Sequence, residues 1–340
     1  MILSSTPPTV TLAAAYRAAH ESAVVVDHGA RGLLLLEGKS RLDLLHRMST
    51  QAVKDLRSGE GAATVLTTEI GRIIDRVIVY ADDEFAFVLT GEGHADALAR
   101  YFRRNIFFND DVRVTDLSAE TAVIGIHGPR AADRLGEIAL DVSGLPLHHW
   151  KLQDSGGEIV SFSVPITSAT VFSKVNFSVH RADPLVGDGY YLIVPVDLVD
   201  SLMQTVKLGT TEFAFIDEAA YDYLRIEAGR PRFGRELTLD YIPLEAGLWD
   251  DVSFHKGCYT GQEIIARMES RGKLAKRLAR LRPASPVAAG AEIVANGRPV
   301  GAITSAADGA GGPVALGYVK TAVLDEGAEL SAAGVPLTTL

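Results

Sequence analysis

Short apolar runs and alternating apolar and polar positions dominate the first part of the chain, and both patterns are typical of β-strands. They predict strands over residues 24–26, 33–36, 64–67, 73–80, 85–89, 112–114 and 122–126. Helical spacing interrupts them twice. One helix is expected after the N-cap residue Ser40, with Leu42, Leu45 and Met48 on one face, and another places residues 95, 98, 99 and 102 on one face. Strands with interposed helices favour an α+β fold.

The pattern changes towards the C-terminus. Further strands are expected within residues 151–180 and over 190–194, and helices over 198–206 and 218–226. After Pro283 the chain predicts only short strands, over residues 292–295, 298–304, 314–319 and 329–336, with the hairpin signal Asn296-Gly297 between the first two. Such a run favours a small barrel or sandwich. We therefore expect a boundary near residue 280, between an interleaved pair of α+β subdomains (1–280) and a C-terminal domain (281–340).

Composition narrows the classes of protein. The chain has 340 residues, of which 47% are hydrophobic and 22% charged, so it can bury sizeable cores in two or three domains. Its net charge of −10 argues against a protein that coats nucleic acid. The single cysteine, Cys258, can form neither an internal disulfide nor a cysteine-rich metal site, and fits a reducing compartment. No signal peptide or long apolar run is evident, so we expect a cytoplasmic protein without a membrane span.

The stretch from Tyr223 to Arg282 holds the most informative chemistry. Glu227 ends an expected helix, where the helix dipole disfavours a carboxylate. Either a nearby arginine such as Arg230 or Arg232 compensates for it, or a ligand with paired N–H donors does.

A second candidate segment follows, where Gly257 and Gly261 flank the cysteine and Tyr259. Two glycines allow a tight turn whose backbone approaches a ligand, but an ordinary turn between domains would look the same. Cys258 could be a buried small hydrophobic residue, or a nucleophile whose pKa is lowered by Lys256 if the two side chains touch.

Two segments resemble known families. Lys-Gly-Cys-Tyr-Thr-Gly-Gln-Glu, at residues 256–263, resembles the signature of the YgfZ family of folate-binding proteins. Leu-Arg-Ile-Glu-Ala-Gly, at residues 224–229, is similar to the corresponding stretch of that family and of the T-protein of the glycine cleavage system. Weaker similarity covers residues 38–53, 71–75 and 128–129. The resemblance implies an α+β fold in which three domains, the last a small β-barrel, form a ring around a central folate cavity.

The resemblance also implies roles for particular residues. The cofactor would be tetrahydrofolate or a one-carbon derivative of it, with the Glu227 carboxylate gripping the pterin. The implied cofactor-binding set is Glu227, Lys256, Gly257, Tyr259 and Arg271. The implied catalytic residues are Cys258 and Asp75, of which Asp75 matches an acidic position that faces the one-carbon end of folate in T-protein.

Basic residues concentrate around the cysteine segment. Residues 256–282 hold eight basic and two acidic side chains, a net charge of +6. The stretch is either a solvated linker or an anion site, for the glutamate tail of folate or for the phosphates of a protein or RNA partner. No aromatic residue lies among the basic ones after Tyr259, so base stacking, and with it direct nucleic acid binding, is not indicated.

The resemblance implies a folate-binding accessory protein that supports assembly or repair of iron–sulfur enzymes, and through them tRNA modification. Its partners would be those enzymes or assembly proteins, and one cysteine could supply one ligand of a cluster. A folate-dependent aminomethyltransferase or demethylase is the alternative, and a binding module without folate is a third.

Two departures from T-protein argue against a classical glycine cleavage aminomethyltransferase. Arg76 replaces the second acidic residue of the T-protein pair, and T-protein lacks the cysteine. If Arg76 approaches Asp75, it stabilises that carboxylate and makes it a weaker base. Alternation along the strand could instead turn Arg76 away.

Overall fold

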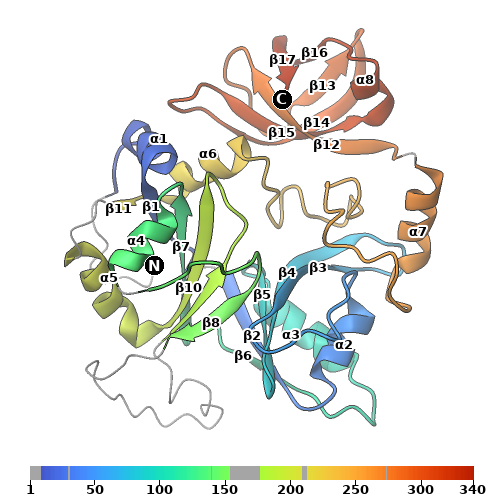
Figure 1. Cartoon of the computed structure of the whole chain (residues 1–340). Coiled ribbons are helices and arrows are strands. Elements are labelled where there is room, and N and C mark those ends of the chain that lie inside the picture. The colour runs from blue at the N-terminus through green and yellow to red at the C-terminus, as the bar shows by residue number, and fades with distance from the viewer. Residues whose placement is uncertain (1–8, 30, 139, 154–176, 209–212, 273) are drawn as a thin grey trace.

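The computed structural model describes residues 9–29, 31–138, 140–153, 177–208, 213–272 and 274–340. The chain forms two α+β lobes that lie side by side, with a closed β-barrel above them (Figure 1). The α+β fold with a C-terminal barrel that the sequence led us to expect is thereby confirmed. None of the helices in the described ranges is long and apolar enough to cross a membrane.

The first lobe is built on a five-stranded antiparallel sheet in the order β3-β4-β5-β2-β6. Its strands are β2 (Arg31–Glu37), β3 (Gly61–Thr67), β4 (Ile73–Ala81), β5 (Phe85–Glu92) and β6 (Arg113–Asp116), and its helices are α2 (Arg41–Met48) and α3 (Ala95–Arg104). The apolar face expected for the second helix, Ala95, Leu98, Ala99 and Phe102, is buried in α3 against the sheet. The 3.6-residue period therefore placed this helix correctly.

The second lobe holds a six-stranded sheet in the order β11-β1-β7-β10-β9-β8, in which only the β1–β11 pair is parallel. Its strands are β1 (Ala23–Asp27), β7 (Thr121–Gly128), β8 (Trp150–Gln153), β9 (Phe177–Arg181), β10 (Asp188–Pro195) and β11 (Phe213–Phe215). Its helices are α1 (Leu12–Glu21), α4 (Ala131–Glu137), the short 3₁₀ helix η1 (Val196–Leu198), α5 (Val199–Leu208) and α6 (Glu218–Glu227). The middle of the strand-rich stretch expected within residues 151–180 lies outside the described residues.

The two sheets share a core. On β2, Leu34 and Leu36 pack into the core of the first lobe, whereas Leu33 and Leu35 join a cluster that includes residues from both sheets. Successive side chains of a strand point to opposite faces. The unbroken apolar run 33–36 therefore marks a strand that is buried on both sides, between its own helices and the neighbouring lobe.

The barrel closes in the order β12-β15-β14-β13-β16-β17. Its strands are β12 (Lys276–Pro283), β13 (Glu292–Ala295), β14 (Arg298–Ala307), β15 (Val314–Lys320), β16 (Leu330–Ala332) and β17 (Val335–Thr339), with the short helix α8 (Thr321–Asp325). Asn296 and Gly297, with φ of 50° and 69°, make the expected hairpin turn. The single strand expected over 329–336 is wrong, because Ala333 and Gly334 also have positive φ and turn the chain between β16 and β17. β12 runs across the boundary expected at residue 280.

The basic stretch 256–282 is not one linker. It contains α7 (Gln262–Arg271), which the spacing of apolar residues did not reveal, and then enters β12. Gly261 and Gly272, with φ of 83° and 59°, bound the helix. Left-handed backbone of this kind favours glycine and stops a helix.

A buried arginine joins α6 to the barrel. Arg225 Nη1 donates to Glu236 Oε2 at 2.8 Å, and Nη2 donates to Ser305 Oγ of β14 at 2.7 Å. Ser305 Oγ in turn donates to Glu236 Oε1 at 2.6 Å. Arg225, Glu236 and Ser305 are all fully buried. This triad ties together the second lobe, the segment after α6 and the barrel.

Arg225→Ala should lower the free energy of unfolding by about 3–5 kcal/mol, because it leaves the Glu236 charge buried without its partner. Urea unfolding measures this. As a control, Arg113→Ala breaks an exposed pair with Glu37 and should cost about 1 kcal/mol or less. Equal small losses in both variants would show that the buried triad does not hold the parts together.

Acid should destabilise the fold through buried histidines. Burial lowers the pKa of His127 and His180 to about 3, so both stay neutral in the folded state when the unfolded chain binds protons. Stability should therefore fall as pH drops from about 6.5 towards 3, by about 1.4 kcal/mol per pH unit for each histidine. Urea titrations between pH 7.5 and 5 test this, and His180→Gln should flatten the slope. An unchanged slope in that variant would contradict the assignment.

Candidate functional site

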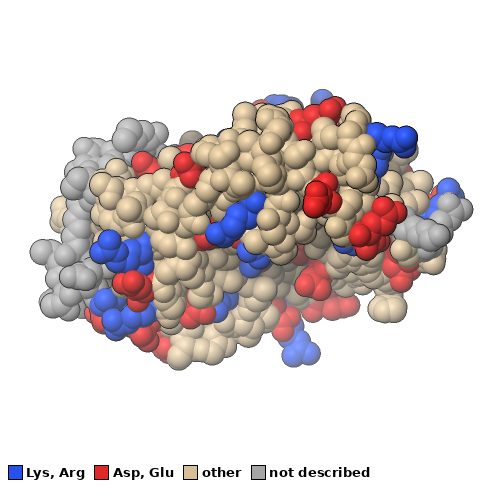
Figure 2. Space-filling model, turned by 90° about the horizontal axis from the view of Figure 1, so that it is seen from above, with Lys and Arg blue, Asp and Glu red and all other residues tan. Residues whose placement is uncertain are grey.

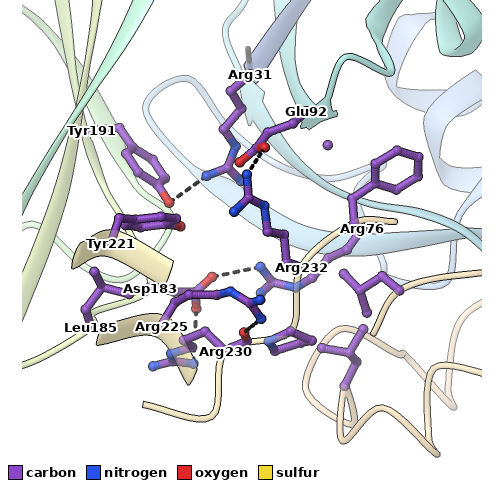
Figure 3. Close-up of a pocket in the computed structure, with 15 residues that line it drawn as sticks. Arg31, Arg76, Glu92, Asp183, Leu185, Tyr191, Tyr221, Arg225, Arg230 and Arg232 are labelled. Atoms are coloured by element: carbon purple, nitrogen blue, oxygen red, sulfur yellow. Dashed lines mark hydrogen bonds and ion pairs between the residues drawn. The ribbon is translucent and has the colours of Figure 1, made fainter. Parts of the chain in front are cut away.

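A pocket lies where the two lobes meet the segment that follows α6, with a cavity of about 110 Å³ (Figure 3). A single water needs roughly 10–15 Å³ of such space, so the cavity has room for a small ligand. Its charged lining consists of five arginines and two acids, namely Arg31, Arg76, Arg225, Arg230, Arg232, Glu92 and Asp183. This lining gives the pocket an excess of positive charge.

Ion pairs hold several of these arginines in place. Arg76 Nη1 donates to Asp183 Oδ2 at 2.8 Å and Arg76 Nε to Asp251 Oδ2 at 2.5 Å. Burial opposes ionisation of Asp183, but Arg76 outweighs it and holds the pKa of Asp183 well below its usual range. Arg232 pairs with Glu92, as Figure 3 shows. Much of the positive charge around the cavity is therefore already compensated.

Asp75 adjoins this pocket. It is fully buried on β4, where its Oδ2 accepts from Gly91 N at 2.9 Å and lies 3.0 Å from His94 Nδ1. His94 stacks on Phe233, with 4.3 Å between ring centroids. Asp75 Oδ1 has no hydrogen-bond partner within the described part of the chain. A buried carboxylate oxygen without a donor is costly, so this atom is suited to accept from a ligand.

Gly91 and Phe233 separate Asp75 from the cavity, since both line it. A Cβ atom at Gly91 would lie 2.6 Å from Phe233 Cγ and 2.8 Å from Asp75 Oδ1. Only glycine allows this approach. Asp75 is therefore one layer behind the pocket wall.

Arg76 does not approach Asp75. Its guanidinium is bound to Asp183 and Asp251, and no ion pair joins it to the neighbouring carboxylate in the described structure. Alternation along β4 turns the two side chains apart, which was the second of the two expectations. The argument that Arg76 weakens Asp75 as a base thus loses its basis.

Glu227 lies away from this pocket. Tyr221 and Arg225, one turn apart on α6, line the cavity, whereas Glu227 follows Arg225 by two residues and so points about 200° around the helix. Its Oε2 lies 3.4 Å from His20 Nε2 of α1, and Tyr16 is hydrogen-bonded to it. The arginine alternative for Glu227 is therefore wrong, since α1 supplies the contacts in place of Arg230 or Arg232, while a ligand with paired N–H donors stays a prediction. The structure does not bring this carboxylate together with Asp75.

Lys256 anchors the loop of residues 256–261, which carries Cys258 and is called the cysteine loop below. Its Nζ donates to the carbonyl oxygens of His46, Ser49 and Gln51 at 2.5, 2.6 and 2.8 Å, at the C-terminal end of α2. Burial lowers the pKa of Lys256 to about 7. An ammonium has three protons, and all three are used by the chain itself. Packing therefore accounts for Lys256, and no proton of its ammonium is left for a cofactor.

The other sequence-derived candidates lie on this loop and on the helix that follows it. Cys258 is exposed, as expected for a reachable thiol. Gly257 is exposed and has room for a Cβ, while Tyr259 is buried beneath the Lys256 ammonium, 4.9 Å from its ring centroid. Arg271 is the last residue of α7, and its side chain lies outside the described residues. Gly257, Cys258 and Tyr259 are not part of the lining of the pocket between the lobes.

The basic side chains of 256–282 have separate partners. Arg267 pairs with Glu263 at 3.1 Å and Arg277 with Asp325 at 3.0 Å, while Lys276 lies 4.2 Å from the Tyr241 ring centroid. Figure 2, which looks down on the barrel, shows Lys and Arg interspersed with Asp and Glu. Arg267, Lys276 and Arg277 are therefore held by three different partners.

Sequence reasoning named Arg76, Arg230 and Arg232 for other reasons and missed the rest of the pocket lining. Arg31, Tyr191, Tyr221 and Phe233 come from four distant parts of the chain and meet only through the fold. The one local signal was Arg31, a charge at the start of an otherwise apolar strand. Groups of three or more potential metal ligands are likewise absent from the described part of the chain.

Comparison with known proteins gives the class of the protein. The GCVT N-terminal domain family matches residues 8–164, and the glycine cleavage T-protein C-terminal barrel domain family matches residues 276–334. The solved structure of glycine cleavage system aminomethyltransferase T from Bartonella henselae has the same fold, with a TM-score of 0.83 over 98% of this chain and 90% of that chain at 22% identity. The chain therefore carries the N-terminal domain and the C-terminal barrel domain of the T-protein superfamily.

Curated proteins similar to this chain include a transferase and several aminomethyltransferases. A chloroplastic protein of Arabidopsis thaliana named as a transferase is 28% identical over 87% of this chain and 65% of its own length. The aminomethyltransferase of Shouchella clausii is 26% identical over 76% of this chain and 66% of its own length. The aminomethyltransferase of Cutibacterium acnes is 28% identical over 94% of this chain and 85% of its own length. The match thus spans slightly less than two thirds of the first two proteins.

Because the thiol is exposed, Cys258 should react with a thiol-alkylating reagent in the folded protein at neutral pH, about as completely as after unfolding. Mass spectrometry of the alkylated chain measures this. The sequence has one cysteine, so Cys258→Ser provides a blank with no labelling. Labelling that begins only when the protein unfolds would mean that the thiol is buried in solution.

Proposed function

We propose that this protein binds tetrahydrofolate, or a one-carbon derivative of it, in the pocket beside Asp75. We further propose that it acts as a YgfZ-type accessory protein that supports assembly or repair of iron–sulfur enzymes, and through them tRNA modification. The observation that carries folate binding is the buried, unpartnered Asp75 Oδ1, one layer behind the wall of a cavity between the lobes.

The residues around the cavity fit a pterin. The ring offers N–H donors, and Asp75 Oδ1 is an acceptor without a donor, behind the aromatic pair of His94 and Phe233. Charge-assisted hydrogen bonds of this kind are strong and directional. Reaching Asp75 requires the wall formed by Gly91 and Phe233 to open, because both line the cavity and Asp75 does not. Bound folate would supply a carrier for a one-carbon unit.

His94 and Asp75 together can hold a proton next to the cavity. Their 3.0 Å contact lets the carboxylate orient the imidazole, and the second carboxylate oxygen stays available. Such a pair is suited to general acid–base work on a ligand that reaches it.

The accessory role is supported by the loop. Cys258 is exposed on a segment that Lys256 fixes to α2, so the thiol is presented outward from a rigid base. A single thiol provides one ligand of an iron–sulfur cluster, so the other ligands would come from a partner or from small thiols. This geometry favours action on another protein.

Aminomethyl transfer is the second candidate function. The superfamily and the Asp75–His94 pair favour it, and the objection based on Arg76 no longer applies, because Arg76 is paired with two aspartates. The exposed cysteine remains the departure from T-protein. Sustained formation of methylene-tetrahydrofolate and ammonia from an aminomethyl-lipoyl carrier, lost in Asp75→Asn, would favour this enzyme activity over the accessory role.

Calorimetric titration with tetrahydrofolate tests the site. Asp75→Asn should weaken binding by roughly 10- to 150-fold, the loss expected for one hydrogen bond to a charged group. The resemblance assigns the pterin to Glu227 instead, so Glu227→Gln is the matched comparison. Asp133→Asn, which alters an exposed carboxylate on α4, is the neutral control.

If Glu227→Gln weakens binding and Asp75→Asn does not, the pterin binds at the end of α6 and the pocket assignment is wrong. If both variants bind tetrahydrofolate as tightly as the parent, neither Asp75 nor Glu227 contacts the pterin. Each variant is first compared with the parent by urea unfolding, so that a loss of fold is not mistaken for a loss of ligand contact.

A further inference from the structure

Arg31 differs from the other arginines of the pocket. Its Nη1 donates to Tyr191 Oη at 2.6 Å and its Nε to the Thr90 carbonyl at 3.3 Å. No carboxylate oxygen of the described residues lies within 4.0 Å of it, whereas each of the other four pairs with at least one. Glu92, its neighbour across the sheet, binds Arg232 instead.

An arginine cannot discard its charge, because the guanidinium stays protonated throughout the pH range in which proteins fold. Arg31 is half-buried, and a charge that is partly withdrawn from water without a counter-ion is unfavourable. The positive charge of Arg31 is therefore not compensated by a carboxylate of the described residues. Because Arg31 lines the cavity, an anion bound there would compensate it.

Two tyrosines share this wall of the cavity with Arg31, and Figure 3 shows all three together. Tyr191 already accepts from Arg31, so its own proton is free to point to a ligand. The Tyr221 hydroxyl makes no hydrogen bond to any residue that the structure describes. Beneath both rings lies buried His28, with its centroid 5.5 Å from Tyr191 and 4.6 Å from Tyr221.

His28 adds no competing charge. Burial lowers its pKa well below the ordinary value, so the imidazole is neutral, and its Nε2 has no partner in the described structure. The wall thus presents one guanidinium and two phenol donors. A planar, two-oxygen anion fits the guanidinium fork better than a point charge does.

We propose that Arg31, Tyr191 and Tyr221 form a carboxylate-binding subsite in this pocket. The carboxylate belongs either to a small acid that occupies the cavity or to the glutamate tail of folate, and both have the same chemistry. The subsite extends the proposed function but does not depend on it, since Asp75 is not part of it.

NMR titrations with ¹³C-labelled acetate and with p-aminobenzoylglutamate, the tail fragment of folate, test the subsite. The parent should bind at least one of them saturably. Arg31→Gln should weaken that binding about tenfold or more, because it removes a charged hydrogen-bond donor. Tyr221→Phe removes only an unpartnered hydroxyl, so it should fold normally and weaken binding by a smaller factor. Arg113→Gln, at an exposed pair with Glu37, should bind like the parent.

Arg31-dependent binding of acetate assigns the subsite to a small acid, and Arg31-dependent binding of the tail fragment alone assigns it to folate. If neither probe binds, or if both bind Arg31→Gln and Tyr221→Phe as tightly as the parent, the proposal is overturned. Asp75→Asn separates the two hypotheses, because it should lose tetrahydrofolate yet keep carboxylate binding. Carboxylate binding without any folate binding would overturn the proposed function alone.

Discussion

The buried contact of Arg225 with Glu236 and Ser305 is the constraint on which the arrangement of the three parts depends. A guanidinium in the interior is tolerated only when its donors are fully used, so α6, the following segment and β14 must meet in one geometry. That geometry fixes the rotation of α6. The same arginine also lines the pocket, so the contact that assembles the molecule also shapes its cavity.

Because of this rotation, one face of α6 lines the cavity and the other packs against the barrel and α1. Tyr221 and Arg225 face the cavity, while Tyr223 packs in the core shared with the barrel strands and Glu227 faces α1. A residue two positions along a helix points nearly the opposite way. Arg225 and Glu227 belong to the same short segment, residues 224–229, yet they lie on separate surfaces of the molecule.

Regular elements were predictable from the sequence where burial follows a simple period. The apolar face of α3, the strands of the first lobe and the Asn296-Gly297 hairpin all follow local rules. Spatial partners were not predictable in this way. Lys256 looked like a ligand-binding cation and is instead saturated by three carbonyl oxygens, while Arg31 looked unremarkable and is the pocket arginine without a carboxylate. Periodicity reports which face is buried, but it does not report what that face meets.

The cysteine loop connects the first lobe with the helix that precedes the barrel. Lys256 binds the start of the loop to α2 of the first lobe, and at its other end the loop enters α7, the last helix before β12 of the barrel. Because the sequence has one cysteine and its thiol is exposed, a label attached to Cys258 would sit on the segment that links the first lobe to the barrel, and at no second position.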